Sequence, residues 1–189
     1  MANIDFPSGL RPIRNNNGDF PVAATMDSVS TVLYKGQLAI LSTTGIVGGP
    51  GTSIITSTIA KKCIGVFAEH KAAGAAGPDG NVAKALVYRD PDQLYVIQAD
   101  DSSTSNLTTT IGRNFQLIGM NAGDSLGNST GELDASTGTS ITTSSVASMV
   151  KVVAVQKNID NTLGASVSWT DFIVLINPKF HILANNGGV

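Results

Sequence analysis

A pentapeptide with the pattern of a serine nucleophile site, GDSLG, lies at residues 123–127. In many hydrolases the pattern G-x-S-x-G places the serine on a sharp turn between a strand and a helix. Here the following residues, NSTGELDASTG, are too rich in glycine, serine and threonine to begin a helix. The sequence therefore favours a glycine-rich turn over catalysis by Ser125.

Histidines that could act as a base or a metal ligand number only two, His70 and His181, and they lie in different segments. Esterases with a GDSL signature also carry a late histidine three residues after an aspartate. Position 178 is a proline, so His181 does not fit that pattern. We predict that the chain is not an enzyme and has no catalytic residues. A hydrolase that uses Ser125 is the least favoured alternative.

Four aspartates bracket one strand-like segment: Asp90 and Asp92 precede it, and Asp100 and Asp101 follow it. An extended strand rises ~3.3 Å per residue, so the two pairs lie roughly 25 Å apart. That distance is larger than the separation of glycosidase carboxylates. We predict solvated strand ends and no bound metal, with calcium held by Asp100, Asp101 and loop hydroxyls as the alternative.

The composition excludes several other kinds of site. Cys63 is the only cysteine, which rules out an internal disulfide and a multi-cysteine metal site; we expect a small buried side chain. The glycine-rich stretches lack the lysine and the following helix of a phosphate-binding loop, so we predict no cofactor. With 14% charged residues and a net charge of −2, we also expect neither nucleic acid nor a membrane as partner.

Strand-forming residues dominate the chain after residue 24. Runs rich in valine, isoleucine and aromatic residues alternate with glycine, proline, asparagine and serine, and no long amphipathic helix is evident. We predict an all-β fold, an antiparallel sandwich or barrel of about seven strands in one domain, residues 25–189. The predicted strands lie within residues 31–41, 59–70, 82–90, 93–100, 111–120, 148–156 and 165–176.

Long loops and extended ends complete this prediction. Residues 122–143 read as a glycine, serine and threonine loop, and a tail begins at about residue 178. Residues 1–24 combine apolar side chains with proline, glycine and asparagine, which predicts an extended N-terminal arm. Trp169 is expected to pack in a core or an interface.

The arm is expected to bind a partner. Ordering ~15 residues costs on the order of 20 kcal/mol. Compensation at ~25 cal/mol per Å² needs roughly 900 Å² of buried apolar surface, more than a strip on its own domain is expected to supply. We therefore predict that the arm becomes ordered on a neighbouring molecule. The predicted contacts are Ile4, Phe6, Leu10, Arg11, Ile13 and Arg14.

Several segments, in order, resemble the decoration or cement proteins of tailed-phage heads, especially those of cyanophages. They are the opening MANIDFPSGLRPIRNNNG, YKGQLAIL followed by GIVGG, KKCIGVFAEH, VYRDPDQLYVIQAD, STGELDAST and NTLGASVSWTDFIVLINPKFHI. The third and fourth segments are separated by KAAGAAGPDGN, where relatives often carry more aromatic residues.

The resemblance implies a β-rich structural protein of the virion without enzymatic activity. Its partner would be the major capsid protein, and it would be a homotrimer on the capsid exterior after synthesis in the host cytoplasm. It would stabilise the assembled shell by clamping adjacent subunits. The alternative is a carbohydrate-binding β-sandwich of a phage tail or fibre, which would need an exposed aromatic platform.

Overall fold

Strands form where β-branched and aromatic residues recur, as in the runs that contain Cys63–Phe67 and Asp171–Ile176. The computed structural model describes residues 5–13, 22–25, 32–42, 45–48, 63–74, 84–100, 110–139, 149–157 and 169–182. The strands are β1 (Arg11–Pro12), β2 (Val22–Thr25), β3 (Leu38–Ser42), β4 (Gly45–Gly48), β5 (Cys63–Phe67), β6 (Lys84–Tyr88), β7 (Leu94–Gln98), β8 (Asn114–Ile118), β9 (Glu132–Thr139), β10 (Val150–Val155) and β11 (Asp171–Ile176).

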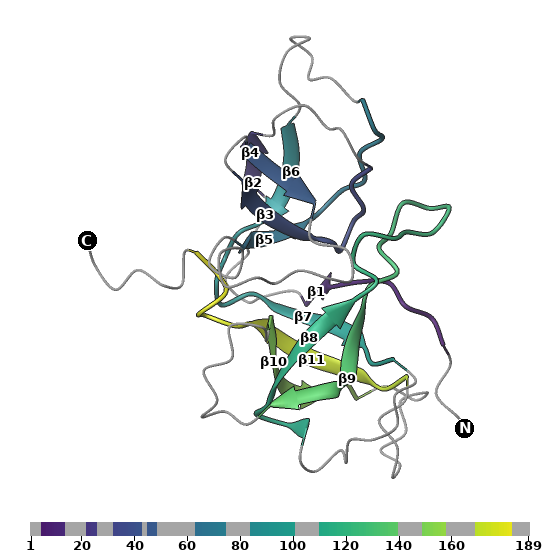
Figure 1. Ribbon diagram of the computed structural model, residues 1–189, viewed down its shortest axis with the longest axis vertical. Helices are drawn as coiled ribbons and strands as arrows, with labels where there is room; N and C mark the ends of the chain where they lie inside the picture. The colour runs from purple at the N-terminus through teal and green to yellow at the C-terminus, as the bar shows by residue number, and fades with distance from the viewer. Residues whose placement is uncertain are drawn as a thin grey trace, which may run out of the picture.

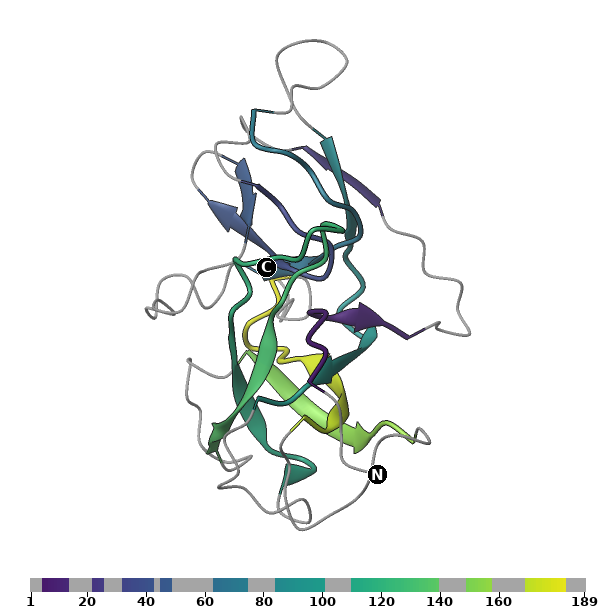
Figure 2. The same cartoon turned by 90° about the vertical axis from the view of Figure 1, so that its right-hand side faces the viewer.

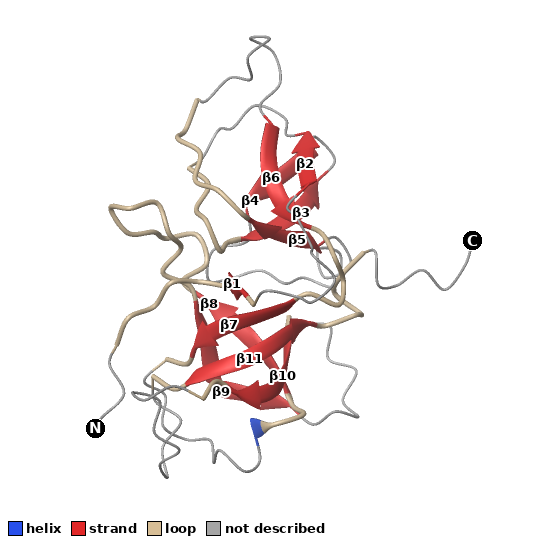
Figure 3. Ribbon diagram, turned by 180° about the vertical axis from the view of Figure 1, so that it is seen from behind, coloured by secondary structure: helices blue, strands red, loops and turns tan. Residues whose placement is uncertain are grey.

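These strands form two open antiparallel sheets. The larger sheet has six strands in the order β1-β7-β11-β10-β8-β9, and the smaller has five in the order β2-β6-β5-β3-β4. The smaller sheet lies above the larger along the long axis (Figures 1 and 3). The all-β antiparallel prediction is confirmed, in the form of a sandwich-like pair of sheets.

One apolar core joins the two sheets. Phe172, Val174 and Ile176 alternate with less buried residues along β11, so one face of this strand points into the core. Leu38 and Val66 enter the same core from the smaller sheet. The shared core explains how short strands in two sheets stabilise one another.

The central strand β5 is buried on both faces. Cys63 and Val66 face the shared core, whereas Ile64 and Phe67 belong to a second cluster on the other side of the smaller sheet. Between them Gly65 has φ +144°, and an added Cβ would collide with the Tyr88 carbonyl oxygen. Only glycine therefore fits where β5 meets β6.

The N-terminal segment lies against its own domain, unlike the predicted arm. Arg11 and Pro12 form β1 and pair with Val96 and Tyr95 of β7. Leu10 is fully buried in the shared core, and its N–H donates to the Gly36 carbonyl at 3.0 Å. Figures 1 and 2 show β1 at the side of the larger sheet that lies toward the smaller sheet. The prediction that a neighbour must order the arm is therefore wrong for this part of the segment.

The chain reaches Leu10 through a tight crossing at Gly9. This residue has φ +63°, and an added Cβ would lie 2.7 Å from the Ser129 Cβ and 2.9 Å from the Gly36 carbonyl oxygen. A larger residue would push the segment away from both neighbours. Burial of Leu10 thus depends on a glycine directly before it.

The C-terminal tail is also docked, at least as far as Ile182. Phe180 and His181 are buried, and the Ile182 N–H donates to the Cys63 carbonyl at 2.8 Å. The expected long loop of residues 122–143 contains a strand, β9, which pairs with β8. Among the described residues, no helix is long and apolar enough to span a membrane.

Candidate interaction surface

The six predicted contact residues have different environments. Leu10 is buried in the core and unavailable to a partner, and Ile13 is half-buried, with its N–H bonded to the Leu94 carbonyl at 2.9 Å. Ile4 and Arg14 lie outside the described residues. The prediction is therefore wrong for Leu10, and Phe6 is the predicted apolar contact that the structure leaves accessible.

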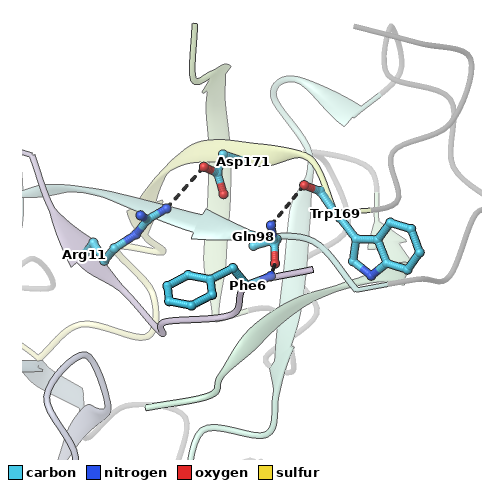
Figure 4. Close-up of polar contacts among 5 residues, drawn as sticks. All are labelled: Phe6, Arg11, Gln98, Trp169 and Asp171. Atoms are coloured by element: carbon cyan, nitrogen blue, oxygen red, sulfur yellow. Dashed lines mark hydrogen bonds and ion pairs between the residues drawn. The ribbon is translucent and has the colours of Figure 1, made fainter. Parts of the chain in front are cut away.

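Phe6 is exposed although its backbone is held. The residue is 70% exposed, and its N–H donates to the Oε1 of Gln98 at 2.7 Å. Gln98 is the last residue of β7 and is itself buried. Figure 4 shows the Phe6 ring extending away from this hydrogen bond. The fold thus fixes an aromatic residue in an exposed position.

The amide nitrogen of Gln98 holds a second segment, the one that contains Trp169. This Nε2 donates to the Trp169 carbonyl at 3.2 Å, and the Trp169 N–H donates to the Ala99 carbonyl at 3.1 Å (Figure 4). Trp169 is half-buried. From the sequence we expected only that Trp169 packs in a core or an interface. Nothing in the local sequence indicates that one glutamine joins both segments.

The backbone of Trp169 is strained. Its φ of +53° makes it the one non-glycine residue with positive φ in the described ranges. Bulky side chains rarely adopt the left-handed region, and such residues persist only when their surroundings hold them. Here the two hydrogen bonds to Gln98 and Ala99 supply that restraint. Strain of this kind is common at binding sites.

Arg11 forms an ion pair within its own chain. Its Nη2 lies 3.2 Å from the Oδ2 of Asp171 in β11, so the ion pair spans β7 from the edge strand β1 (Figure 4). The Arg11 side chain is 46% exposed, and a pair of this kind contributes about 0–1 kcal/mol. Arg11 therefore positions the segment, and a partner carboxylate would have to compete with Asp171.

Three carboxylates lie near the end of β7 at which Gln98 holds Phe6. Burial raises the pKa of Glu132, and the nearby Asp5 and Asp100 carboxylates raise it further. Asp5 precedes Phe6, Asp100 follows β7, and Glu132 begins β9. A bridge between Ala99 and Leu133 brings the ends of these strands together. The surface therefore combines an exposed aromatic ring with negative charge.

Two of the aspartates that precede or follow β7 accept hydrogen bonds from backbone N–H groups. The Asp100 Oδ1 accepts a hydrogen bond from the Ala135 N–H at 3.1 Å, and the Asp90 Oδ1 accepts one from the Asp92 N–H at 2.8 Å. Asp101, the other half of the calcium alternative, lies outside the described residues. Within those residues, no group of three or more metal-binding side chains is close enough to hold an ion.

The GDSLG segment is a turn that local hydrogen bonds hold in place. The Asp124 carboxylate accepts hydrogen bonds from Asn128 and from the Leu126 N–H, and these bonds, led by the Asn128 side chain, lower its pKa. His70 packs beside Gly127, but the described residues show no hydrogen bond between His70 and Ser125. The Asp124 carboxylate therefore holds its own turn together.

Cys63 and His181 meet inside the domain through a backbone bridge. Burial raises the pKa of the Cys63 thiol to about 12, against a smaller opposing effect of its hydrogen bond to the Gly65 carbonyl. Burial also lowers the pKa of His181 to about 4, with a further contribution from Arg89, while Asp92 opposes the shift. Both groups are therefore uncharged at neutral pH, and the prediction of a buried Cys63 is confirmed.

Comparison with known proteins yields no relative: no protein-family model, no curated protein and no solved structure matches this chain.

Proposed function

We propose that this chain is a structural protein of a virus particle, a decoration protein that binds the assembled major capsid protein shell of a tailed phage and stabilises it. The ordered set of segments that resembles the decoration proteins suggests the class. The observation that carries the proposal is Phe6, an exposed aromatic residue on a backbone held by Gln98. Such a residue is suited to fill an apolar pocket of a partner.

On this proposal the chain has no catalytic task. Its all-β domain is a rigid support, and the segment that contains β1 presents Phe6 to the shell from the outside of the capsid. A homotrimer would place three copies of this contact around adjacent capsid subunits. Several weak contacts acting together would then give tight binding without a large surface on each copy.

The direct test uses expanded heads assembled from the major capsid protein encoded in the same genome. The purified chain should co-sediment with these heads to a saturating ratio. The saturated heads should release their contents at a higher temperature than bare heads. Unexpanded shells serve as the control for a site that forms on expansion. Absence of saturable binding would refute the proposal.

A carbohydrate-binding module of a tail or fibre is the second candidate. Trp169 favours it, because this aromatic residue is only half-buried and could stack on a sugar ring. A glycan array would decide between the two candidates. Specific binding that is lost in Trp169→Ala would support the second candidate, and a blank array would remove it.

A further inference from the structure

Both aromatic residues at the end of β7 are positioned in advance by one buried side chain. Gln98 accepts from the Phe6 N–H at 2.7 Å and donates to the Trp169 carbonyl at 3.2 Å. Leu10, which follows Phe6 in the same segment, is buried in the core and anchors that segment. The backbone of Phe6 has therefore already lost most of its freedom on folding, and a partner that buries the ring would not have to order it.

Three carboxylates, those of Asp5, Asp100 and Glu132, lie near one another at this end of β7. The neighbours that raise the pKa of Glu132 are both carboxylates, Asp5 and Asp100. The nearest described cation of the N-terminal segment, Arg11, pairs with Asp171 at 3.2 Å. Complementary surfaces bring opposite charges together, and like charges placed opposite each other are strongly disfavoured. An acidic or polyanionic partner is therefore disfavoured at this surface.

We propose that the surface formed by Phe6 and Trp169, with Asp5, Asp100 and Glu132 around them, docks onto a basic protein surface that has an apolar pocket for Phe6. The inference rests on the proposed function in naming the capsid shell as the carrier of that basic surface. It adds the docking face of this chain and the charge of its partner. Lysine or arginine side chains of the shell would face the three carboxylates.

A pair of matched charge reversals tests this proposal on expanded heads. Asp5 and Asp92 are both exposed, and they lie on segments at opposite ends of β7. Each change to lysine alters the net charge by the same amount, from −2 to 0. D5K should weaken binding at low salt by about tenfold or more, whereas D92K should stay within about twofold of the parent. F6A should weaken binding by about tenfold or more.

A second arm does not depend on the heads. Trp169 is the only tryptophan, so its fluorescence reports on this surface alone. The probes are the peptides acetyl-Lys-Leu-Leu-Lys-amide and acetyl-Glu-Leu-Leu-Glu-amide. The lysine peptide should change the emission of the parent and of D92K at low salt, and the glutamate peptide should not. D5K should lose the response to the lysine peptide.

The head-binding experiment and the peptide experiment together distinguish a failure of the docking face from a failure of the proposed function. Heads that bind the parent, D5K and D92K equally would overturn the docking face while leaving the proposed function in place. Heads that bind none of them would refute the proposed function, and the peptide arm would then decide the inference. A parent that responds to neither peptide, or equally to both, would overturn the charge assignment in that case.

Discussion

At the scale of single residues, Gln98 determines how the candidate surface is presented. Its amide joins two segments that are 92 and 71 positions away in the sequence, at Phe6 and Trp169. Trp169 needs such a restraint because a non-glycine residue with φ +53° is unfavourable on its own. Local sequence could not have indicated this role, since a glutamine at the end of a strand has no distinctive pattern.

Replacing Gln98 by alanine should therefore disturb both segments at once. We expect a loss of about 1–3 kcal/mol in the free energy of unfolding, because buried hydrogen-bonding groups lose their partner. The emission of Trp169 should shift toward that of a solvent-exposed indole. Gln116→Ala is the matched control, since the Gln116 contact to Thr137 uses its backbone N–H. Equal effects of the two substitutions in urea unfolding would contradict the role of Gln98.

His181 should make the stability of the domain depend on pH. Its pKa is lowered from 6.5 to about 4 in the folded protein, so the unfolded chain binds a proton in this range before the folded chain does. The free energy of unfolding should fall as the pH is lowered from about 6.5 to about 4, by about 2–3 kcal/mol. Urea unfolding at a series of pH values measures this slope.

Two histidine variants provide the control for that slope. His181→Leu removes the buried imidazole and should flatten the dependence in this pH range. His70→Gln removes the other histidine of the chain and controls for the loss of an imidazole as such. If the His181→Leu protein keeps the full slope, other groups cause it and the assignment is wrong.

At the scale of elements, the N-terminal segment acts as a strap between the two sheets. β1 adds an edge strand to the larger sheet beside β7, and β2 adds an edge strand to the smaller sheet beside β6. Leu10 enters the shared core directly before β1. The apolar residues of this segment therefore serve two purposes, since Leu10 stabilises the fold and Phe6 stays accessible.

Leu10 and Phe6 should accordingly respond differently to truncation. Leu10→Ala should lower the free energy of unfolding by about 3 kcal/mol, because it leaves a cavity in the core. Phe6→Ala should change it by less than about 0.5 kcal/mol, because the side chain is exposed and its backbone hydrogen bond remains. Urea unfolding of both variants measures the difference. Similar losses for the two would show that the segment is not arranged as described.

The elements also show which parts of a β fold can be predicted from sequence. The seven predicted strands correspond to β3, β5, β6, β7, β8, β10 and β11. These strands carry β-branched and aromatic side chains that favour the extended state locally. The sequence RP of β1 lacks that signal, GIVG of β4 carries it only over two residues between glycines, and ELDASTGT of β9 mixes it with acidic and small residues. A neighbouring strand that offers its hydrogen bonds makes strands of these segments.

At the scale of the whole molecule, the sheets bring distant segments together at the end of β7. The candidate surface combines Asp5, Phe6, Asp100, Glu132 and Trp169. The sequence indicated Phe6 as a contact from its place in an apolar, proline-punctuated segment. Asp5 is its neighbour in the chain, but Asp100, Glu132 and Trp169 could not be grouped with it, because only the order of strands in the larger sheet brings them close.

This arrangement leads to one account of the molecule. A core shared by two sheets supports an N-terminal strap, and the strap displays Phe6. On our proposal, the carboxylates near Phe6 select a basic partner. In the proposed setting that partner is the outer surface of a phage head. Stabilisation of the head would come from linking adjacent capsid subunits rather than from any chemistry.

Electron cryomicroscopy of expanded heads, with and without the purified chain, tests the central claim most directly. A difference map should show added density on the outer surface of the shell, with the end of β7 that carries Phe6 directed toward the capsid protein. Heads incubated with the Phe6→Ala protein should show much weaker density at the same positions. A difference map without added density on the outer surface would contradict the account.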